Sequence, residues 1–198
     1  MIIVFTGEGK GKTTASLGQA VRAVGRGKNV LMIQFIKGPW QSGEDFIEMK
    51  RQSDPPIRST KLKVAINGIE QAASSGQVTK GNFELKKMGL GFVGILGDQL
   101  PREEHSKAAK KALECFKKEL PKRDLVILDE VNVAVSLNLI TAQEVIAAVG
   151  NLPKEKLVIF TGRGAPQEFI NAADLVTEMK DVKHPFWGGK LGKAGVEF

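Results

Sequence analysis

The fold is decided by one stretch near the N-terminus, Gly7-Glu8-Gly9-Lys10-Gly11-Lys12-Thr13-Thr14. Apolar residues 2–5 before it predict a short buried strand, and small and apolar residues at helical spacing over 12–24 predict a helix after it. A glycine-rich loop between a strand and a helix is typical of a phosphate-binding loop, because its N–H groups and the helix N-terminus face one anion. A glycine-rich surface turn is the alternative, and the strand–loop–helix context favours the phosphate loop.

The side chains of this loop suit a triphosphate with a magnesium ion. Lys12 would supply a full positive charge to phosphate oxygens, and Thr13 would offer its hydroxyl to the metal. The usual spacing, G-x-x-x-x-G-K-[ST], requires glycine at position 6, where this chain has Thr6. The loop is therefore shorter than usual, and Lys10 adds a second lysine inside it. We expect a tighter anion nest, in which the phosphates need not lie as in an ordinary ATPase.

Strand and helix patterns alternate along the rest of the chain. Strands are predicted at 29–36, 125–128, 157–160 and 174–178, and helices at 103–119, 141–149 and 166–173. This alternation predicts an α/β fold of the P-loop (RecA-like) type, a mostly parallel sheet with helices on both faces. We expect a single nucleotide-binding domain over residues 1–198. Residues 54–81 are polar and rich in turn formers, so we expect an insertion or lid there.

Composition and charge argue against several classes of protein. The net charge is +7, but the lysines are spread along the chain, and there is no dense basic block or aromatic–basic repeat for nucleic acid. No apolar run is long enough to span a membrane, and the N-terminus lacks the pattern of a signal peptide. The single cysteine, Cys115, cannot form an internal disulfide, so we expect a cytoplasmic protein.

Two polar motifs follow predicted strands at the carboxyl edge of the sheet. Asp129 and Glu130 end the strand 125–128, where such a pair can reach a magnesium ion beside the phosphate loop. In a hydrolase the second acid would instead activate water, and two solvated loop acids are the third interpretation. Arg163 lies in Thr161-Gly-Arg-Gly164, where it can bind phosphate oxygens and stabilise a departing polyphosphate. A turn with a solvated arginine is the alternative.

Neither histidine shows the spacing of a metal site. His105 lies on the predicted amphipathic helix 103–119, and we expect it to face water. His184 lies beside the glycine-rich tail, and no further His or Cys stands at ligand spacing from either residue. The histidines are therefore not assigned to a metal.

Several short runs occur in an informative order: Thr6-Gly-Glu-Gly-Lys-Gly-Lys-Thr-Thr-Ala, Arg22-Ala-Val-Gly-Arg-Gly-Lys-Asn-Val, Gln34-Phe-Ile-Lys-Gly38, Leu128-Asp-Glu130, Thr161-Gly-Arg-Gly164, and Val182-Lys-His184 with Lys193-Ala-Gly-Val-Glu-Phe198. Together with the shortened loop, they resemble the CobA/BtuR family of corrinoid adenosyltransferases. The resemblance covers nearly the whole chain except residues 54–81. It implies that ATP and a reduced corrinoid such as cobalamin are the substrates. The Co(I) centre of the corrinoid would attack the 5′ carbon of ATP, and the whole triphosphate would leave.

The resemblance also implies roles for individual residues. Lys12 and Arg163 would stabilise the charge that builds on the triphosphate, and Arg22 aligns with an arginine that contacts the nucleotide. Thr13 and Glu130, with Asp129 nearby, would hold Mg²⁺ or Mn²⁺. A homodimer and a flavodoxin-like reductant are the partners that the family suggests.

The corrinoid side departs from the family pattern. Where the family has Gly-Phe-Thr-Trp, this chain has Gly91-Phe92-Val93-Gly94, so the Phe that faces the corrin is present and the Trp is not. Core packing is the alternative role for Phe92. Two interpretations follow: another aromatic residue, Trp40 or Trp187, compensates, or the corrinoid is held differently.

Two other functions remain open from the residues alone. A P-loop ATPase or kinase acting at the γ-phosphate predicts ADP as product instead of triphosphate. A basic, nucleotide-dependent nucleic-acid binder predicts tight binding that weakens steeply with salt.

Overall fold

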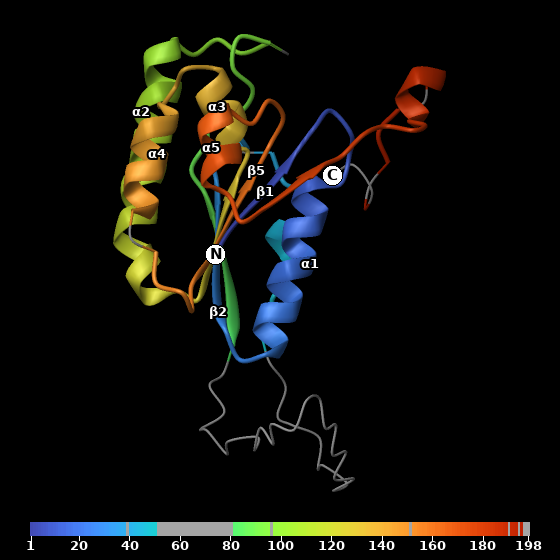
Figure 1. The fold of residues 1–198 in the computed structure, drawn as a ribbon. Helices are drawn as coiled ribbons and strands as arrows, with labels where there is room; N and C mark the ends of the chain where they lie inside the picture. Colours follow the sequence, from blue (N-terminus) through green and yellow to red (C-terminus); the bar gives the residue numbers. More distant parts are fainter. Residues whose placement is uncertain are drawn as a thin grey trace, which may run out of the picture.

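The computed structural model describes residues 1–38, 40–50, 81–95, 97–150, 152–189, 191–193 and 195. Its described part is one six-stranded sheet with helices on both faces (Figure 1). The strands are β1 (Ile2–Thr6), β2 (Asn29–Gln34), β3 (Asn82–Lys87), β4 (Leu125–Asp129), β5 (Leu157–Thr161) and β6 (Leu175–Glu178). The α-helices are α1 (Lys12–Gly25), α2 (Arg102–Glu119), α3 (Val131–Ser136), α4 (Ala142–Val149) and α5 (Gln167–Ala172). Short 3-10 turns are η1 (Gly43–Phe46), η2 (Leu120–Lys122) and η3 (Pro185–Gly188).

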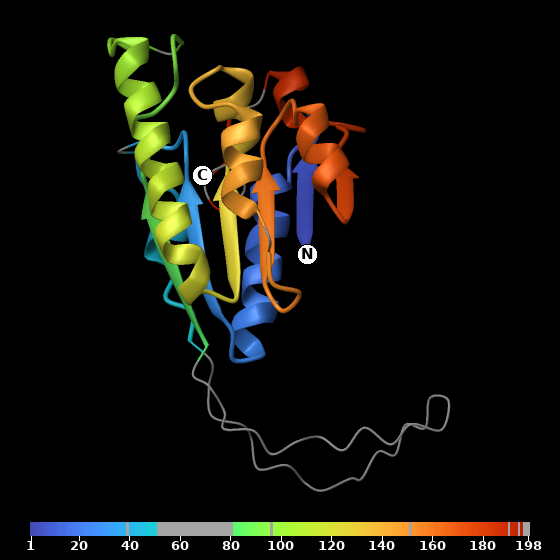
Figure 2. The same ribbon diagram turned by 60° about the vertical axis from the view of Figure 1, so that its left-hand side comes forward.

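The strands lie in the order β3-β2-β4-β5-β1-β6, and every pair of neighbours is parallel. All their carboxyl ends therefore meet at one edge of the sheet, as the arrowheads in Figure 2 show. The phosphate loop leaves this edge after β1, and the Asp129-Glu130 pair leaves it after β4. Chain segments far apart in sequence thus converge where parallel α/β sheets bind their ligands.

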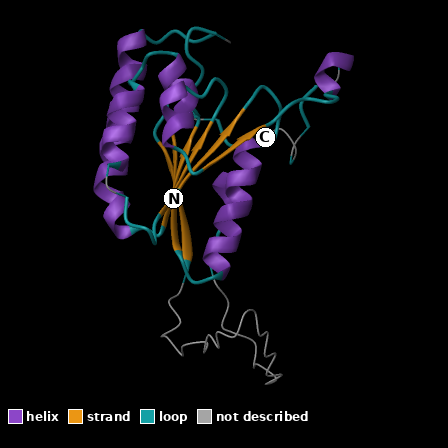
Figure 3. Cartoon of the chain, in the orientation of Figure 1, coloured by secondary structure: helices purple, strands orange, loops and turns teal. Residues whose placement is uncertain are grey.

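Two hydrophobic cores cover the two faces of the sheet. Alternate residues of each central strand point to opposite faces, as the pleat requires. In β2, for example, Val30 and Met32 pack with α1, while Leu31 and Ile33 pack under α2 to α5. Figure 3 shows this division, with α1 on one side of the strands and α2 to α5 on the other. Each central strand is buried on both faces, which explains its nearly continuous apolar sequence.

The predicted α/β class and the helices on both faces are confirmed, and two elements were not predicted. The edge strand β3, Asn-Phe-Glu-Leu-Lys-Lys, carries charges of the kind that protect sheet edges. The short helix α3 follows directly after Glu130. Strand β2 also ends at Gln34 and not at Ile36. The proposed insertion or lid lies, except for Gly81, outside the described residues. Within the described ranges, no helix has the length and apolar character needed to cross a membrane.

Candidate active site

Lys12 lies inside the curve of the phosphate loop. Its side chain is 7% exposed, and its Nζ donates hydrogen bonds to the carbonyl oxygens of Gly7 (2.8 Å) and Gly9 (2.6 Å). Burial lowers the pKa of Lys12, and the nearby carboxylate of Glu130 opposes this shift. The loop therefore holds a cation beside its own backbone, at the N-terminus of α1, where phosphate oxygens are favoured.

The loop packs closely against the chain that follows β6. The N–H of Gly9 donates to the carbonyl of Met179 (2.8 Å), and the N–H of Lys10 donates to Asp181 Oδ1 (3.2 Å). These two N–H groups are therefore used within the protein, and are not free for a bound phosphate as the glycine pattern suggested. A Cβ atom on Gly9 would lie 2.7 Å from the carbonyl carbon of Lys180. Glycine is required here because another chain segment leaves no room for a side chain.

Replacing Gly9 with alanine should therefore destabilise the protein. A methyl group at this position forces the loop and the backbone of residues 179–180 apart, which we expect to cost about 2 kcal/mol of unfolding free energy. Urea unfolding measures this difference. Gly18→Ala is the matched control, because Gly18 lies within α1 with nothing near its Cβ position, and alanine there should stabilise the helix. Equal stability of Gly9→Ala and the wild type would contradict the close packing.

Asp129 is fully buried at the end of β4 and organises its surroundings. Its Oδ1 accepts hydrogen bonds from the hydroxyls of Thr13 (2.8 Å) and Thr161 (2.7 Å), and its Oδ2 accepts one from Gln34 Nε2 (3.2 Å). Burial raises the pKa of Asp129, although Lys37 and the two hydroxyls oppose the rise. Because the Thr13 hydroxyl donates its hydrogen to Asp129, its oxygen lone pairs remain available to a cation.

Glu130 stands beside Asp129 in a left-handed backbone conformation, with φ of 61°. Its N–H donates to the Thr161 hydroxyl (3.0 Å), which fixes this unusual geometry. Its carboxylate reaches Gly162, where an added Cβ would lie 3.0 Å from Oε2. Burial, and then the charge of Asp129, raise the pKa of Glu130 to about 7, against the opposing charge of Lys12. Two neighbouring carboxylates, one fully buried and one partly exposed, favour a cation between them and the phosphate loop.

These oxygen groups fit magnesium. The Thr13 hydroxyl and the carboxylates of Asp129 and Glu130 are hard ligands, and Mg²⁺ is usually held by one or two carboxylates together with substrate phosphates and water. Among the described residues there is no group of three His, Cys, Asp or Glu that could hold a metal by itself. The donor set therefore suits a metal ion that is coordinated partly by the phosphates of a substrate, and not one coordinated by protein side chains alone.

The two arginines of the predicted site are placed differently. Arg163 Nη1 lies 3.3 Å from Glu8 Oε2, so this pair joins the loop after β5 to the phosphate loop, and both side chains are exposed. Arg22 lies in the last turn of α1 and is exposed. The rise of the helix puts it about 15 Å along the axis from Lys12. Within the described chain, the structure brings Arg163 to the loop and does not bring Arg22 there, so the role of Arg22 stays a prediction.

A polar network beside Asp129 was not predicted from the sequence. Gln34 is fully buried and also donates to Glu44 Oε1 (3.0 Å), and Lys37 forms an ion pair with the same carboxylate. Burial raises the pKa of Glu44, but the hydrogen bond and charge of Lys37 outweigh it and lower the pKa to about 2. The available signal was Gln34 itself, because a polar residue interrupts the mostly apolar run 29–36. In the structure Gln34 ends β2 at the carboxyl edge of the sheet.

Replacing Glu44 with glutamine should reduce stability in a pH-dependent way. The folded pKa lies below the unfolded value of 4.5, so the ion pair stabilises the protein above pH 4.5 and is lost as the pH falls towards 2. We expect a loss of about 2 kcal/mol at neutral pH, after allowing for screening at this partly open site. Thermal unfolding from pH 7 to 3 measures it. Glu48→Gln, which removes a carboxylate from an exposed ion pair, is the control. A difference in unfolding free energy between the wild type and Glu44→Gln that stays the same at every pH would contradict the assignment.

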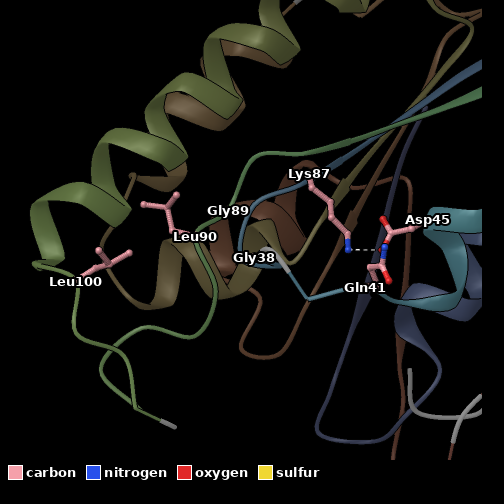
Figure 4. Close-up of a pocket in the computed structure, with 7 residues that line it drawn as sticks. All are labelled: Gly38, Gln41, Asp45, Lys87, Gly89, Leu90 and Leu100. Carbon is pink, nitrogen blue, oxygen red and sulfur yellow. Dashed lines mark hydrogen bonds and ion pairs between the residues drawn. The ribbon is translucent and has the colours of Figure 1, made fainter.

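A cavity of about 630 Å³ opens at the carboxyl ends of β2 and β3 (Figure 4). It is lined by Gly38, Gln41, Asp45, Lys87, Gly89, Leu90 and Leu100. Figure 4 shows the polar side chains of this lining on one side of the cavity and the two leucines on the other. The lining therefore offers an apolar surface and polar groups to the same ligand.

Two aromatic rings belong to the loops after β2 and β3, which also contribute residues to the lining of this cavity. The centroids of Trp40 and Phe92 are 5.8 Å apart, and the side chains are 60% and 45% exposed. Core packing as the role of Phe92 is therefore wrong. Trp40 also lies over Gly91, where an added Cβ would approach its ring to 2.8 Å. The side chain of Trp187 lies outside what the structure describes.

The expectation that His105 faces water is wrong. Its side chain is only 3% exposed, and its ring Nε2 lies 3.0 Å from Asp98 Oδ2. His105 is buried because the loop before α2 folds back over the first turn of that helix, a tertiary contact that helical periodicity cannot show.

Comparison with known proteins identifies the relatives of this chain. A family model described as ATP:corrinoid adenosyltransferase BtuR/CobO/CobP matches residues 1–198. The corrinoid adenosyltransferase CobA of Salmonella typhimurium is 36% identical over 200 residues, which cover 100% of this chain and 85% of the relative. The corrinoid adenosyltransferase of Escherichia coli K12 is 34% identical with the same coverage, and that of a Sinorhizobium species is 32% identical over 100% of this chain and 80% of its own length. With its phosphate loop, its buried acids and this full-length match, the chain belongs to the ATP:corrinoid adenosyltransferase family.

Proposed function

We propose that this protein transfers the 5′-deoxyadenosyl group of ATP to the Co(I) centre of a reduced corrinoid and releases triphosphate. The observation that carries the proposal is a pair of neighbouring sites at one edge of the sheet. The phosphate loop follows β1, and the cavity with its aromatic rings follows β2 and β3. A family match to corrinoid adenosyltransferases supports the same pairing of substrates.

The spacing of the two sites suits this reaction. Strands β4 and β5 separate β2 from β1, so three strand spacings, about 14 Å, lie between the two sites. A nucleoside triphosphate held by its phosphates at Lys12 can extend across this distance towards the cavity. Asp129 and Thr161 end the two strands between these sites, β4 and β5, and the nucleotide would lie across these strand ends.

The reaction requires no general base. A cobalt–carbon bond forms at C5′ as the bond from C5′ to the triphosphate oxygen breaks, and no proton leaves the nucleophile. The protein must orient two substrates and stabilise negative charge on the departing triphosphate. Lys12 and Lys10 supply compensating positive charge from the loop, and Arg163 supplies more after exchanging Glu8 for a phosphate oxygen. These roles account for a site rich in cations without requiring an acid–base pair.

We assign the metal to Thr13 and Glu130, with Asp129 behind them. The hydrogen bond from Thr13 to Asp129 orients the hydroxyl oxygen, and the carboxylate of Glu130, which interacts electrostatically with Lys12, supplies a second carboxylate. Mg²⁺, or Mn²⁺ in its place, would neutralise charge on the triphosphate when bound.

The exposed aromatic pair suits the flat apolar face of a corrin ring. Phe92 is the residue that the family places there, and we propose that Trp40 supplies the second aromatic ring in this chain, since Gly94 stands where the family has tryptophan. Stacking of this kind contributes about 1 kcal/mol for each ring. The further partners proposed from the family are a flavodoxin-like electron donor and a second copy of the chain. A reducing cytoplasm is the proposed location, because it suits a free cysteine, Cys115.

The test of this function is direct. The protein is incubated in the dark with ATP, Mg²⁺ and chemically reduced cobalamin. We expect a product with a light-sensitive cobalt–carbon bond, seen as a visible spectrum that is lost on illumination. If no such product forms under strictly anaerobic conditions, the proposed function is wrong.

A further inference from the structure

We propose that Asp98 and His105 are positioning residues that hold the loop carrying Phe92 in the shape that receives the corrinoid. This inference rests on the proposed function, because it concerns how the same site is built. The loop comprises residues 91–95 and 97–100, between β3 and α2.

The Asp98 carboxylate is the centre of this arrangement. Its Oδ2 accepts hydrogen bonds from the N–H of Gly94 (2.8 Å) and from His105 Nε2 (3.0 Å), and its Oδ1 accepts one from the N–H of Leu100 (3.1 Å). The side chains of Asp98 and His105 are 8% and 2% exposed. A carboxylate shielded in this way requires these donors, so the pair specifies one conformation of the loop.

The backbone of the loop needs such an anchor. Gly91, Gly94 and Gly97 all have positive φ, at 110°, 69° and 82°. Glycine adopts these angles readily but also loses the most conformational freedom on ordering, so a segment with three of them does not hold its shape by backbone preference. Asp98 bonds directly to Gly94 and lies next to Gly97, where it can restrain two of the three glycines.

The other end of the anchor is rigid. His105 lies in the first turn of α2, beside Ser106, whose hydroxyl donates to the carbonyl of Leu139 (2.7 Å). Arg102 in the same turn donates to the carbonyl of Leu137. The helix start is thus fastened to the segment after α3, and Asp98 transmits this fixed position to the loop.

The anchored segment reaches the corrinoid side of the site at both ends. Phe92 and Gly91 contact Trp40 at one end, and Leu100 lines the cavity at the other. Releasing Asp98 would therefore disturb the cavity and the aromatic pair together. The phosphate loop and the Asp129 carboxylate make none of these hydrogen bonds, so they should be unaffected.

The test separates positioning from general stability. We would measure KM for cob(I)alamin, KM for ATP and the unfolding temperature of Asp98→Ala, with Asp98→Asn in case the alanine variant does not fold. Loss of hydrogen bonds to a shielded carboxylate should raise the KM for cob(I)alamin about tenfold and leave the KM for ATP unchanged. His105→Phe should act in the same direction, and His105→Gln, which keeps a donor, should partly restore the corrinoid KM. Glu104→Gln is the control, because it removes an exposed ion pair with Lys107 from the same helix.

A readout without activity comes from Trp40. In a Trp187→Phe background, acrylamide quenching of Trp40 fluorescence should increase in Asp98→Ala and not in Glu104→Gln. An unchanged corrinoid KM, an equal rise of both KM values, or unchanged quenching would overturn the inference. Failure of the wild type to form an adenosylated corrinoid would overturn the proposed function instead, and the quenching result would still decide whether Asp98 anchors the loop.

Discussion

Replacing Lys12 with alanine should lower kcat/KM for ATP by about a thousandfold, or about 4 kcal/mol of transition-state stabilisation. Lys12 is held inside the phosphate loop by the carbonyls of Gly7 and Gly9, so its ammonium group lies where triphosphate oxygens would bind. The triphosphate gains negative charge as its bond to C5′ breaks, and a desolvated cation at that point stabilises the transition state more than the bound substrate. Both kcat and the affinity for ATP should therefore fall.

Initial rates of adenosylcobalamin formation at varied ATP concentration measure this effect. Lys10→Ala is the matched control, since it removes an exposed lysine of the same loop. We expect it to lower kcat/KM only about tenfold, as befits a screened surface charge. Circular dichroism would establish that both variants are folded. If the two alanine variants lost activity equally, the special position of Lys12 would be refuted.

Replacing Glu130 with glutamine should lower kcat about a hundredfold and raise the Mg²⁺ concentration needed for half-maximal rate. Glutamine has nearly the same shape but lacks the charge that a hard divalent ion requires. The same substitution should stabilise the metal-free protein at pH 8. The folded pKa of Glu130, about 7, lies above the unfolded value of 4.5, so its ionised form opposes folding above pH 7, and this penalty fades as the pH falls towards 4.5.

Activity and stability should thus move in opposite directions in Glu130→Gln. Thermal unfolding at pH 8 and pH 5, without metal, should show a gain of about 2 kcal/mol at the higher pH only. Magnesium titrations of the rate supply the other half of the test. An unaltered magnesium requirement would mean that Glu130 is not a ligand, whatever its effect on stability.

The phosphate loop and the central strands were accessible from sequence because their determinants are local. The glycines and lysines of Gly7–Thr14 lie between two strongly patterned elements, and the strands beneath them are nearly continuous apolar runs. The edge strand β3 was missed because only Phe83 and Leu85 alternate with charged residues in it, and so short an alternation does not mark a strand. Its pairing with β2, and not its own composition, makes it a strand.

The candidate site was predictable where one residue type implies one chemistry. Lys12, Thr13, Asp129 and Arg163 converge as expected, since the carboxyl ends of parallel strands share one edge. The Gln34–Glu44 network and the Asp98–His105 pair were not foreseen. The network and the pair both depend on loops that fold back onto buried side chains. Such tertiary contacts produce no periodic pattern in the sequence, so they could not be predicted from it.

The most direct test of the account is the identity of the phosphate product. Its central claim is that the phosphate loop binds the triphosphate as the leaving group, so that attack occurs at C5′ and not at the γ-phosphate. ATP labelled at the γ-phosphate should be incubated with the protein, Mg²⁺ and cob(I)alamin, and the products separated by anion-exchange chromatography. We predict that the label appears in intact triphosphate, in equal amount to the adenosylcobalamin formed. Label in inorganic phosphate, with ADP as its partner and no adenosylated corrinoid, would contradict the account.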